Sequence, residues 1–248
     1  MLEILRFAQD DVDMRLDQAI AARFPGISRR KARELLASGS ILVNHRRVSI
    51  ASREVGEKDE IAIVGERPHI PILALHADWL AVDKPAGLPT QPPRERKELS
   101  LEDILRAEYK RIWLVHRLDT PTSGVVVFAR SPQAAARLSK LFASREMRKT
   151  YIARVDPPIA ERAVIDTPID GKEAVTIVTP RGGGLVEVQI ETGRTHQIRR
   201  HLSSIGHPVA GDRRYGSTVS TARLMLHAWK LEHAELGTIE APIPPDFL

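Results

Sequence analysis

HRLDTPTSG, residues 116–124, is a charged and hydroxyl-rich stretch between two short apolar runs, 112–115 and 125–129. Such runs are typical of buried strands, so we expect the polar residues to form a loop that two strands present. Local physics leaves two interpretations of this loop open. Asp119 and Ser123 organise a turn while Arg117 pairs with an acid, or the loop carries chemistry.

A second polar string, ETGRTHQIRRH at 191–201, gathers arginine, histidine and glutamine at the start of a predicted helix, 196–204. Thr195 is expected to cap this helix. A helix N-terminus with arginines attracts anions such as RNA phosphate or a carboxylate, whereas the simpler interpretation is a solvated basic face. His196 and His201 are five residues apart and point in different directions on a helix, so we expect no metal site.

The chain of 248 residues is long enough for one large domain and a small appendage. Gly, Pro and charged residues interrupt the apolar pattern at 65–71, which predicts a small domain at 1–67 and a larger one at 68–248. The small domain is expected to contain two helices followed by short strands, with Ser28 placed to cap the second helix. The larger domain mixes strands and helices, which predicts an α+β fold. Its expected strands include 149–155, 174–179, 185–191 and 224–231.

Composition excludes several classes of protein. The chain has no cysteine, which excludes disulfides, thiolate nucleophiles and cysteine-ligated metal sites. Acidic residues near the N-terminus and the lack of an 18-residue apolar stretch predict no signal peptide, no membrane partner and a cytoplasmic location. The net charge is +5, and the segment 23–53 contains eight basic residues and one acidic residue, a local charge of +7. This clustering is typical of a phosphate-binding surface.

The chain resembles the ribosomal large-subunit (RluA) family of pseudouridine synthases over most of residues 73–248. Five ordered motifs carry the resemblance: WLAVDKPAGL at 79–88, HRLDTPTSG at 116–124, KTYIA at 149–153, TGRTHQIRRHLSSIGHPVAGDRRYG at 192–216 and LMLHAWKL at 224–231. The resemblance implies a pseudouridine-synthase fold, in which a mixed, mainly antiparallel β-sheet is flanked by helices.

Three catalytic residues follow from the resemblance. Asp119 matches the family's catalytic aspartate, and Tyr151 matches the tyrosine that stacks on the target base. Arg199 matches the basic residue that pairs with the aspartate. Thr120 departs from the family's pattern, since a basic residue is frequent at this position, and this obscures RNA contacts without affecting the chemistry.

Four further residues are implied to bind the substrate. Arg117 matches an arginine that helps to displace the target nucleotide from the RNA stack, and Ile198 matches an apolar residue packed against the base. Arg194 and His196 belong to the same helix-start motif as Ile198 and Arg199, and are expected to contact the substrate.

The N-terminal segment resembles the small RNA-binding module named after a ribosomal small-subunit protein. The matching stretches are RLD at 15–17, SRRKARELL at 28–36 and ILVN at 41–44. The arginine-rich helix is expected to lie against the RNA backbone, whereas the simpler interpretation is a solvated helix face. The expected RNA-binding residues are Arg29, Arg30, Lys31, Arg33, Arg46 and Arg47.

The resemblance implies an enzyme that isomerises uridine to pseudouridine in structured RNA, with 23S ribosomal RNA as the expected substrate. No group is transferred and no oxidation occurs, so no cofactor is expected. The same reaction on transfer RNA, and a non-catalytic role in RNA binding or ribosome assembly, are the alternatives. The sequence does not indicate an oligomeric state.

Overall fold

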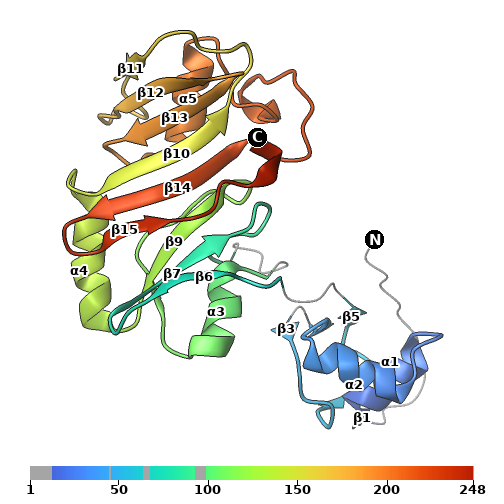
Figure 1. Cartoon of the computed structure of the whole chain (residues 1–248). Coiled ribbons are helices and arrows are strands. Elements are labelled where there is room, and N and C mark those ends of the chain that lie inside the picture. Colours follow the sequence, from blue (N-terminus) through green and yellow to red (C-terminus); the bar gives the residue numbers. More distant parts are fainter. Residues whose placement is uncertain (1–12, 45, 64–67, 93–98, 248) are drawn as a thin grey trace. The chain divides into compact units, whose positions relative to one another are not determined.

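The computed structural model describes residues 13–44, 46–63, 68–92 and 99–247 (Figure 1). The chain divides into two compact units, one that ends at His69 and one that begins at Ile70. No helix in the described ranges is both long and apolar enough to cross a membrane.

The N-terminal unit consists of two helices and short strands. Its elements are β1 (Met14–Arg15), α1 (Leu16–Arg23), α2 (Arg29–Ala37), β2 (Ile41–Val43), β3 (Arg46–Arg47), β4 (Glu54–Val55) and β5 (Ile61–Ile63). Ser28 caps α2 as expected, because its Oγ accepts a hydrogen bond from the Lys31 backbone N–H at 3.2 Å. Leu16, Ile20 and Leu36 form the core with residues of β2. The predicted order of helix, helix and strands is therefore confirmed.

Asp17, in the first turn of α1, is fully buried and binds three arginines. Its carboxylate accepts hydrogen bonds from Arg15 at 3.1 Å, Arg29 at 3.3 Å and Arg33 at 2.9 Å. Burial alone would raise the pKa of Asp17, but these hydrogen bonds outweigh it and lower the pKa to about 2. Asp17 therefore ties α2 to α1.

We expect Asp17→Asn to destabilise the N-terminal unit by about 2 kcal/mol, because asparagine offers the three arginines no negative charge. In the native protein the folded pKa lies below the ordinary value of 3.8, so this stabilisation is complete above about pH 3.8 and is lost as pH falls towards about 2. Hydrogen exchange of the α1 and α2 amides measures the effect. Glu34→Gln is the control, since Glu34 is half exposed and pairs with Arg30 and Lys31. Equal exchange in the two variants would refute the role of Asp17.

The second unit is built on a ten-stranded sheet. The main path runs in the order β11 (Ala163–Ile165), β12 (Thr176–Gly182), β13 (Leu185–Ile190), β10 (Arg148–Arg154), β14 (Leu226–His233), β9 (Ser123–Ala129), β7 (Trp79–Lys84) and β6 (Ile72–Leu75). Two strands lie off this path: β15 (Gly237–Glu240) pairs with β14, and β8 (Trp113–Leu114) pairs with β9. The β9–β14 pair is parallel and the other pairs are antiparallel, which confirms the predicted mixed, mainly antiparallel sheet.

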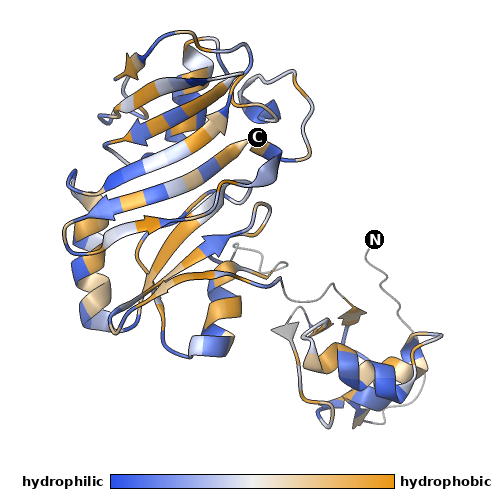
Figure 2. Cartoon of the chain, in the orientation of Figure 1, coloured by the Kyte–Doolittle hydropathy of each residue, from blue (hydrophilic) through white to orange (hydrophobic). Residues whose placement is uncertain are grey.

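Helices cover both faces of this sheet. Val125 and Val127 of β9 pack in one cluster with α4 (Pro132–Ala143), whereas Val126 and Phe128 pack in another with α3 (Leu101–Tyr109). Successive strand residues point to opposite faces, so every residue of β9 is buried. Figure 2 shows β9 as an apolar ribbon between these helices, and β7 as apolar except at its hydrophilic C-terminal end. A third cluster packs α5 (Gln197–Ser204) against β10, β12 and β13.

The contact between β9 and β14 fixes the end of the loop 116–122. Gly124 has a φ of +113°, and a Cβ at this position would lie 2.2 Å from the Ala228 carbonyl oxygen. Only glycine allows so close an approach of two backbones. Two short turns of 3-10 helix complete the unit: η1 (Arg213–Tyr215) and η2 (Pro245–Phe247).

Candidate active site

The first three residues of the loop 116–122 are held by polar side chains. His116 Nε2 accepts a hydrogen bond from the Val127 backbone N–H at 2.9 Å, and its ring stacks on Phe142. Burial lowers the pKa of His116 to about 3, which keeps this nitrogen an acceptor. Thr90 Oγ1 donates to the Leu118 carbonyl at 2.8 Å and accepts from the Leu118 N–H at 3.2 Å. The backbone that leads into Asp119 is therefore fixed.

Lys84 ties the same loop to the turn after β7. Its side chain is fully buried, and Nζ donates hydrogen bonds to the carbonyls of Pro85, Leu88 and Thr120 at 3.0, 2.7 and 3.1 Å. An ammonium has three N–H donors, so all of them are used. Burial lowers the pKa of Lys84 to about 8, although the charges of Asp119 and Asp83 oppose this shift.

The second wall of the site begins at α5. The predicted helix is present, but the Thr195 cap is wrong: His196 is the N-cap residue, with a φ of 56° and no side-chain capping hydrogen bond. The side chain of Gln197 instead fixes the chain at the start of α5 through hydrogen bonds. Its Oε1 accepts from Thr192 Oγ1 at 2.8 Å and from the Arg194 N–H at 3.0 Å, while Nε2 donates to the Val175 carbonyl at 2.9 Å.

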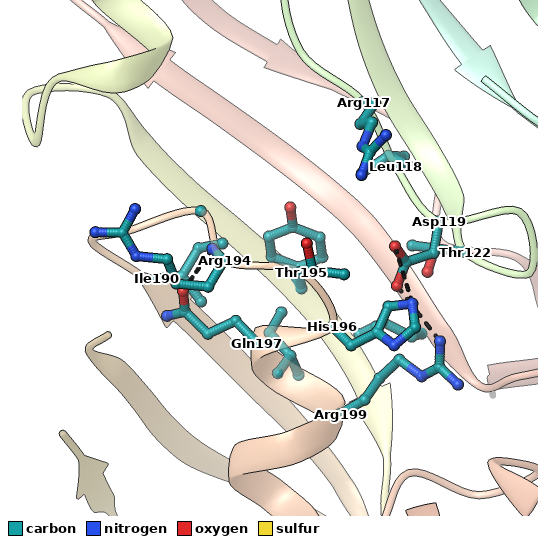
Figure 3. A pocket seen from close by; sticks show the side chains of 14 residues that line it. Arg117, Leu118, Asp119, Thr122, Ile190, Arg194, Thr195, His196, Gln197 and Arg199 are labelled. Carbon is teal, nitrogen blue, oxygen red and sulfur yellow. Dashed lines mark hydrogen bonds and ion pairs between the residues drawn. The ribbon is translucent and has the colours of Figure 1, made fainter. Parts of the chain in front are cut away.

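The loop and α5 enclose a cavity of about 220 Å³ between them (Figure 3). The predicted catalytic residues Asp119, Tyr151 and Arg199 all line it. So do the four residues expected to bind substrate, which are Arg117, Ile198, Arg194 and His196. The structure therefore brings together seven residues that the sequence supplies from three separate segments.

Asp119 lies opposite two basic side chains of α5. Arg199 Nη1 is 3.5 Å from Asp119 Oδ2, and His196 Nε2 is 3.7 Å from Asp119 Oδ1 (Figure 3). The Asp119 side chain is 28% exposed, so its oxygens remain accessible from the cavity. Burial lowers the pKa of His196, against the opposing charge of Asp119, which favours the neutral imidazole.

Arg199 has a second, stronger carboxylate partner that the sequence did not indicate. Its Nε and Nη2 donate to the two oxygens of Asp212 at 2.6 and 2.8 Å, and both side chains are buried. The Tyr215 ring lies against the same guanidinium, with 5.0 Å from the Arg199 Cζ to the ring centroid. The Tyr215 hydroxyl is 2.8 Å from His196 Nδ1.

Tyr151 and Ile198 belong to the apolar part of the cavity wall, together with Leu118, Ile190 and Leu226. Tyr151 comes from the middle of β10 and is half-buried, while Ile198 is only 4% exposed. Burial raises the pKa of the Tyr151 phenol, and the charge of Asp119 adds to this shift. Their aromatic and branched surfaces are suited to holding a flat, partly apolar group.

The two remaining residues that were expected to bind substrate, Arg117 and Arg194, differ in exposure and in bonding. Arg117 is exposed, and Thr122 on the same loop is buried. Arg194 is held, because its Nε donates to the Glu173 carbonyl at 2.9 Å. Within the described ranges, no group of three or more His, Asp or Glu side chains is arranged to hold a metal ion.

The predicted RNA-binding residues fall into three groups. Arg29 and Arg33 pair with the buried Asp17. Arg30 and Lys31 are exposed and contact Glu34, with the Arg30 side chain 91% exposed. The side chains of Arg46 and Arg47 lie outside the part of the chain that the structure describes.

Sequence reasoning left Lys84, Asp212 and Tyr215 without a role. A signal for Lys84 was present, since a lysine before Pro85 directly follows an apolar strand. Asp212 and Tyr215 belong to the GDRRYG stretch at 211–216, where an acid and an aromatic residue follow a glycine. Their contact with Arg199 depends on how this turn folds over α5, which local patterns do not reveal.

Comparison with known proteins identifies both parts of the chain. A family model described as RNA pseudouridylate synthase matches residues 78–204, and an S4 domain model matches residues 14–61. A protein of Zymomonas mobilis named "uncharacterized RNA pseudouridine synthase" is 38% identical over 71% of this chain and 94% of its own length. The ribosomal large subunit pseudouridine synthase D of Nitrosomonas europaea is 31% identical over 94% of this chain and 82% of its own length.

Solved structures agree with this assignment. The human RNA pseudouridylate synthase domain containing 4 matches with a TM-score of 0.62 and 26% identity, over 71% of this chain and 90% of that chain. The chain therefore belongs to the RNA pseudouridylate synthase family and carries an S4 domain before its catalytic fold.

Proposed function

We propose that this pseudouridine synthase modifies specific uridines of 23S ribosomal RNA, with residues 68–248 as its catalytic domain, residues 1–67 as its RNA-binding domain, and the cytoplasm as its location. Relatives named for the ribosomal large subunit, at 30 to 31% identity, support the choice of RNA. Transfer RNA is the alternative substrate. A non-catalytic role is disfavoured because Asp119, Tyr151 and Arg199 line one cavity.

Asp119 is the proposed catalytic group. Isomerisation breaks the bond between ribose C1′ and uracil N1, turns the base and forms a bond from C1′ to C5, after which C5 loses its proton. The Asp119 carboxylate can add to C1′ as nucleophile or remove a ribose proton in a glycal route. Both routes require an accessible carboxylate beside a compensating cation, which is the arrangement of Asp119 and Arg199.

Tyr151 and Ile198 are proposed to hold the uracil, with Arg117 at the accessible edge of the cavity. A uridine in a stacked RNA must leave the stack to reach Asp119, at a cost of a few kcal/mol. The exposed Arg117 is suited to fill the place of the displaced base, whereas Arg194 and His196 complete the wall around it.

The N-terminal unit is proposed to supply binding energy that offsets this cost. Arg30 and Lys31 project from α2 into solvent, where they can reach RNA phosphates. Arg29 and Arg33 share the buried Asp17, so their charge is partly compensated and their structural role adds to any contact with RNA.

We expect Asp119→Asn to abolish tritium release from ribosomal RNA that contains 5-tritiated uridine, while the affinity for RNA changes little. The variant keeps the size of the side chain and removes its negative charge. Asp78→Asn serves as the control, since Asp78 pairs with Arg137 outside the cavity. Tritium release by Asp119→Asn at the rate of the control would overturn the proposed catalytic role.

Tyr151 is expected to act as a neutral phenol. Because burial and Asp119 raise its pKa, no phenolate of Tyr151 should form up to about pH 10, where an ordinary tyrosine is half ionised. The difference in ultraviolet absorbance between the native protein and Tyr151→Phe, followed through an alkaline titration, measures this. A phenolate signal that Tyr151→Phe lacks and that appears near pH 9 or below would contradict the prediction.

Replacing both Arg30 and Lys31 with alanine should weaken RNA binding and reduce the slope of log K against log salt concentration by about 1 to 2, since each phosphate contact releases counterions. Filter binding at several salt concentrations measures the slope. Arg137→Ala is the matched control, because it removes one arginine that is paired with Asp78 and Glu235. If the double variant keeps the native slope, α2 does not contact RNA phosphate.

A further inference from the structure

Two carboxylates, Asp119 and Asp212, contact the guanidinium of Arg199, which lines the cavity. Asp212 takes two short, charge-assisted hydrogen bonds from Arg199, at 2.6 and 2.8 Å. Asp119 is left with a single contact from Nη1 at 3.5 Å. Hydrogen bonds between guanidinium and carboxylate are normally about 2.7 to 2.9 Å long, so Asp119 has a weaker hydrogen bond from Arg199 than Asp212 has.

Asp212 is held in place independently of Arg199. Its N–H donates to the Val209 carbonyl at 3.0 Å, and its own carbonyl accepts from the N–H groups of Tyr215 and Ser217 at 3.1 and 3.0 Å. Gly211 before it has a φ of +80°, and a Cβ there would lie 2.5 Å from the Arg223 carbonyl oxygen. The turn that carries Asp212 is therefore rigidly built, as a residue that orients another requires.

Tyr215 closes the remaining side of the guanidinium. Its ring lies 5.0 Å from the Arg199 Cζ, and its backbone carbonyl accepts from Ser203 Oγ of α5 at 2.7 Å. Arg199 is thus fixed by a carboxylate at one edge and an aromatic ring on one side, and only Nη1 is directed at Asp119.

We propose that Asp212 is a positioning residue. Its hydrogen bonds orient Arg199 so that the guanidinium stays next to Asp119 but does not form a tight salt bridge with it. A carboxylate bound by two short hydrogen bonds has its lone pairs occupied and is a poor nucleophile and a poor base. A carboxylate with one long contact still has an adjacent cation and keeps lone pairs free for the ribose. This inference rests on the proposed role of Asp119.

The consequence of losing Asp212 has a definite sign. Without the Asp212 charge, the guanidinium of Arg199 is free to turn so that two of its N–H groups donate to Asp119. The site also loses one negative charge. The Asp119 carboxylate then has fewer lone pairs free for the ribose, so the rate of the chemical step falls while RNA binding is unchanged. The other groups that face Asp119 are His196 of α5, Lys84 of β7, Tyr151 of β10 and Arg117 of its own loop, and the variant leaves all of them in place.

The test compares Asp212→Asn with Asp170→Asn. Asp170 is 71% exposed and pairs with Arg200, the neighbour of Arg199 on α5, so the control removes a carboxylate from an adjacent arginine outside the cavity. Single-turnover tritium release is measured at neutral pH over a range of enzyme concentrations, which separates the rate at saturation from the half-saturating concentration, together with RNA affinity and thermal unfolding.

For Asp212→Asn we expect a loss of roughly tenfold or more in the rate at saturation, with the half-saturating concentration and the RNA affinity unchanged. A rate at saturation equal to that of Asp170→Asn, or a loss confined to the half-saturating concentration, would overturn the positioning role. If Asp212→Asn does not fold, Asp212→Glu keeps the charge but displaces the guanidinium of Arg199. It should then lower the rate at saturation with RNA affinity unchanged, and a native rate would refute the proposal.

Failure of this inference is distinguishable from failure of the proposed function. If Asp119→Asn is inactive while Asp212→Asn matches the control, only the positioning role is lost. If Asp119→Asn retains activity, the role of Asp119 fails first, and the role of Asp212 fails with it.

Discussion

The site depends on the position of one guanidinium between two carboxylates. Arg199 is buried on α5 and contacts Asp212 through two short hydrogen bonds and Asp119 through one long contact. A buried arginine without such partners would be strongly destabilising, so the fold must bring an acid to it. The loop 116–122, the N-terminus of α5 and the turn at 209–217 meet at this point.

The sheet is what allows these segments to meet. β9 and β14 pair in parallel where Gly124 lies against Ala228, directly after the loop that carries Asp119. β10 lies on the other side of β14 and contributes Tyr151. Helices α3 and α4 bury both faces of β9, which makes the strand a rigid base for the loop. Lys84 and Thr90 then fix the loop backbone. An accessible carboxylate is thus presented by a strongly constrained scaffold.

Much of this arrangement was predictable because it is encoded locally. The apolar run at 125–129 predicted a buried strand, and Ser28 predicted the start of α2. The motifs around Asp119, Tyr151 and Arg199 predicted residues of one site, and all three line one cavity. Helix α3 was missed although Ser100 and Asp103 form a capping box at its start, a pattern that the sequence does contain.

The differences between the sequence-based expectations and the structure concern contacts that depend on tertiary structure. Thr195 satisfies the pattern of a cap, but the chain turns at His196 in a left-handed conformation instead. From the sequence, Arg29 and Arg33 look like unpaired cations, whereas in the folded protein both pair with Asp17 of α1. Asp212 is thirteen residues from Arg199, and only the folded turn brings the two together. Sequence motifs identify candidate site residues, whereas the partner of each residue is a property of the fold.

The most direct test of the account is a crystal structure of the protein with an RNA that carries 5-fluorouridine at a modified position. The account predicts a base outside the RNA stack, held in the cavity between Tyr151 and Ile198, with the Asp119 carboxylate next to the ribose C1′. RNA bound with every base still stacked, or a base in the cavity whose ribose faces away from Asp119, would contradict it.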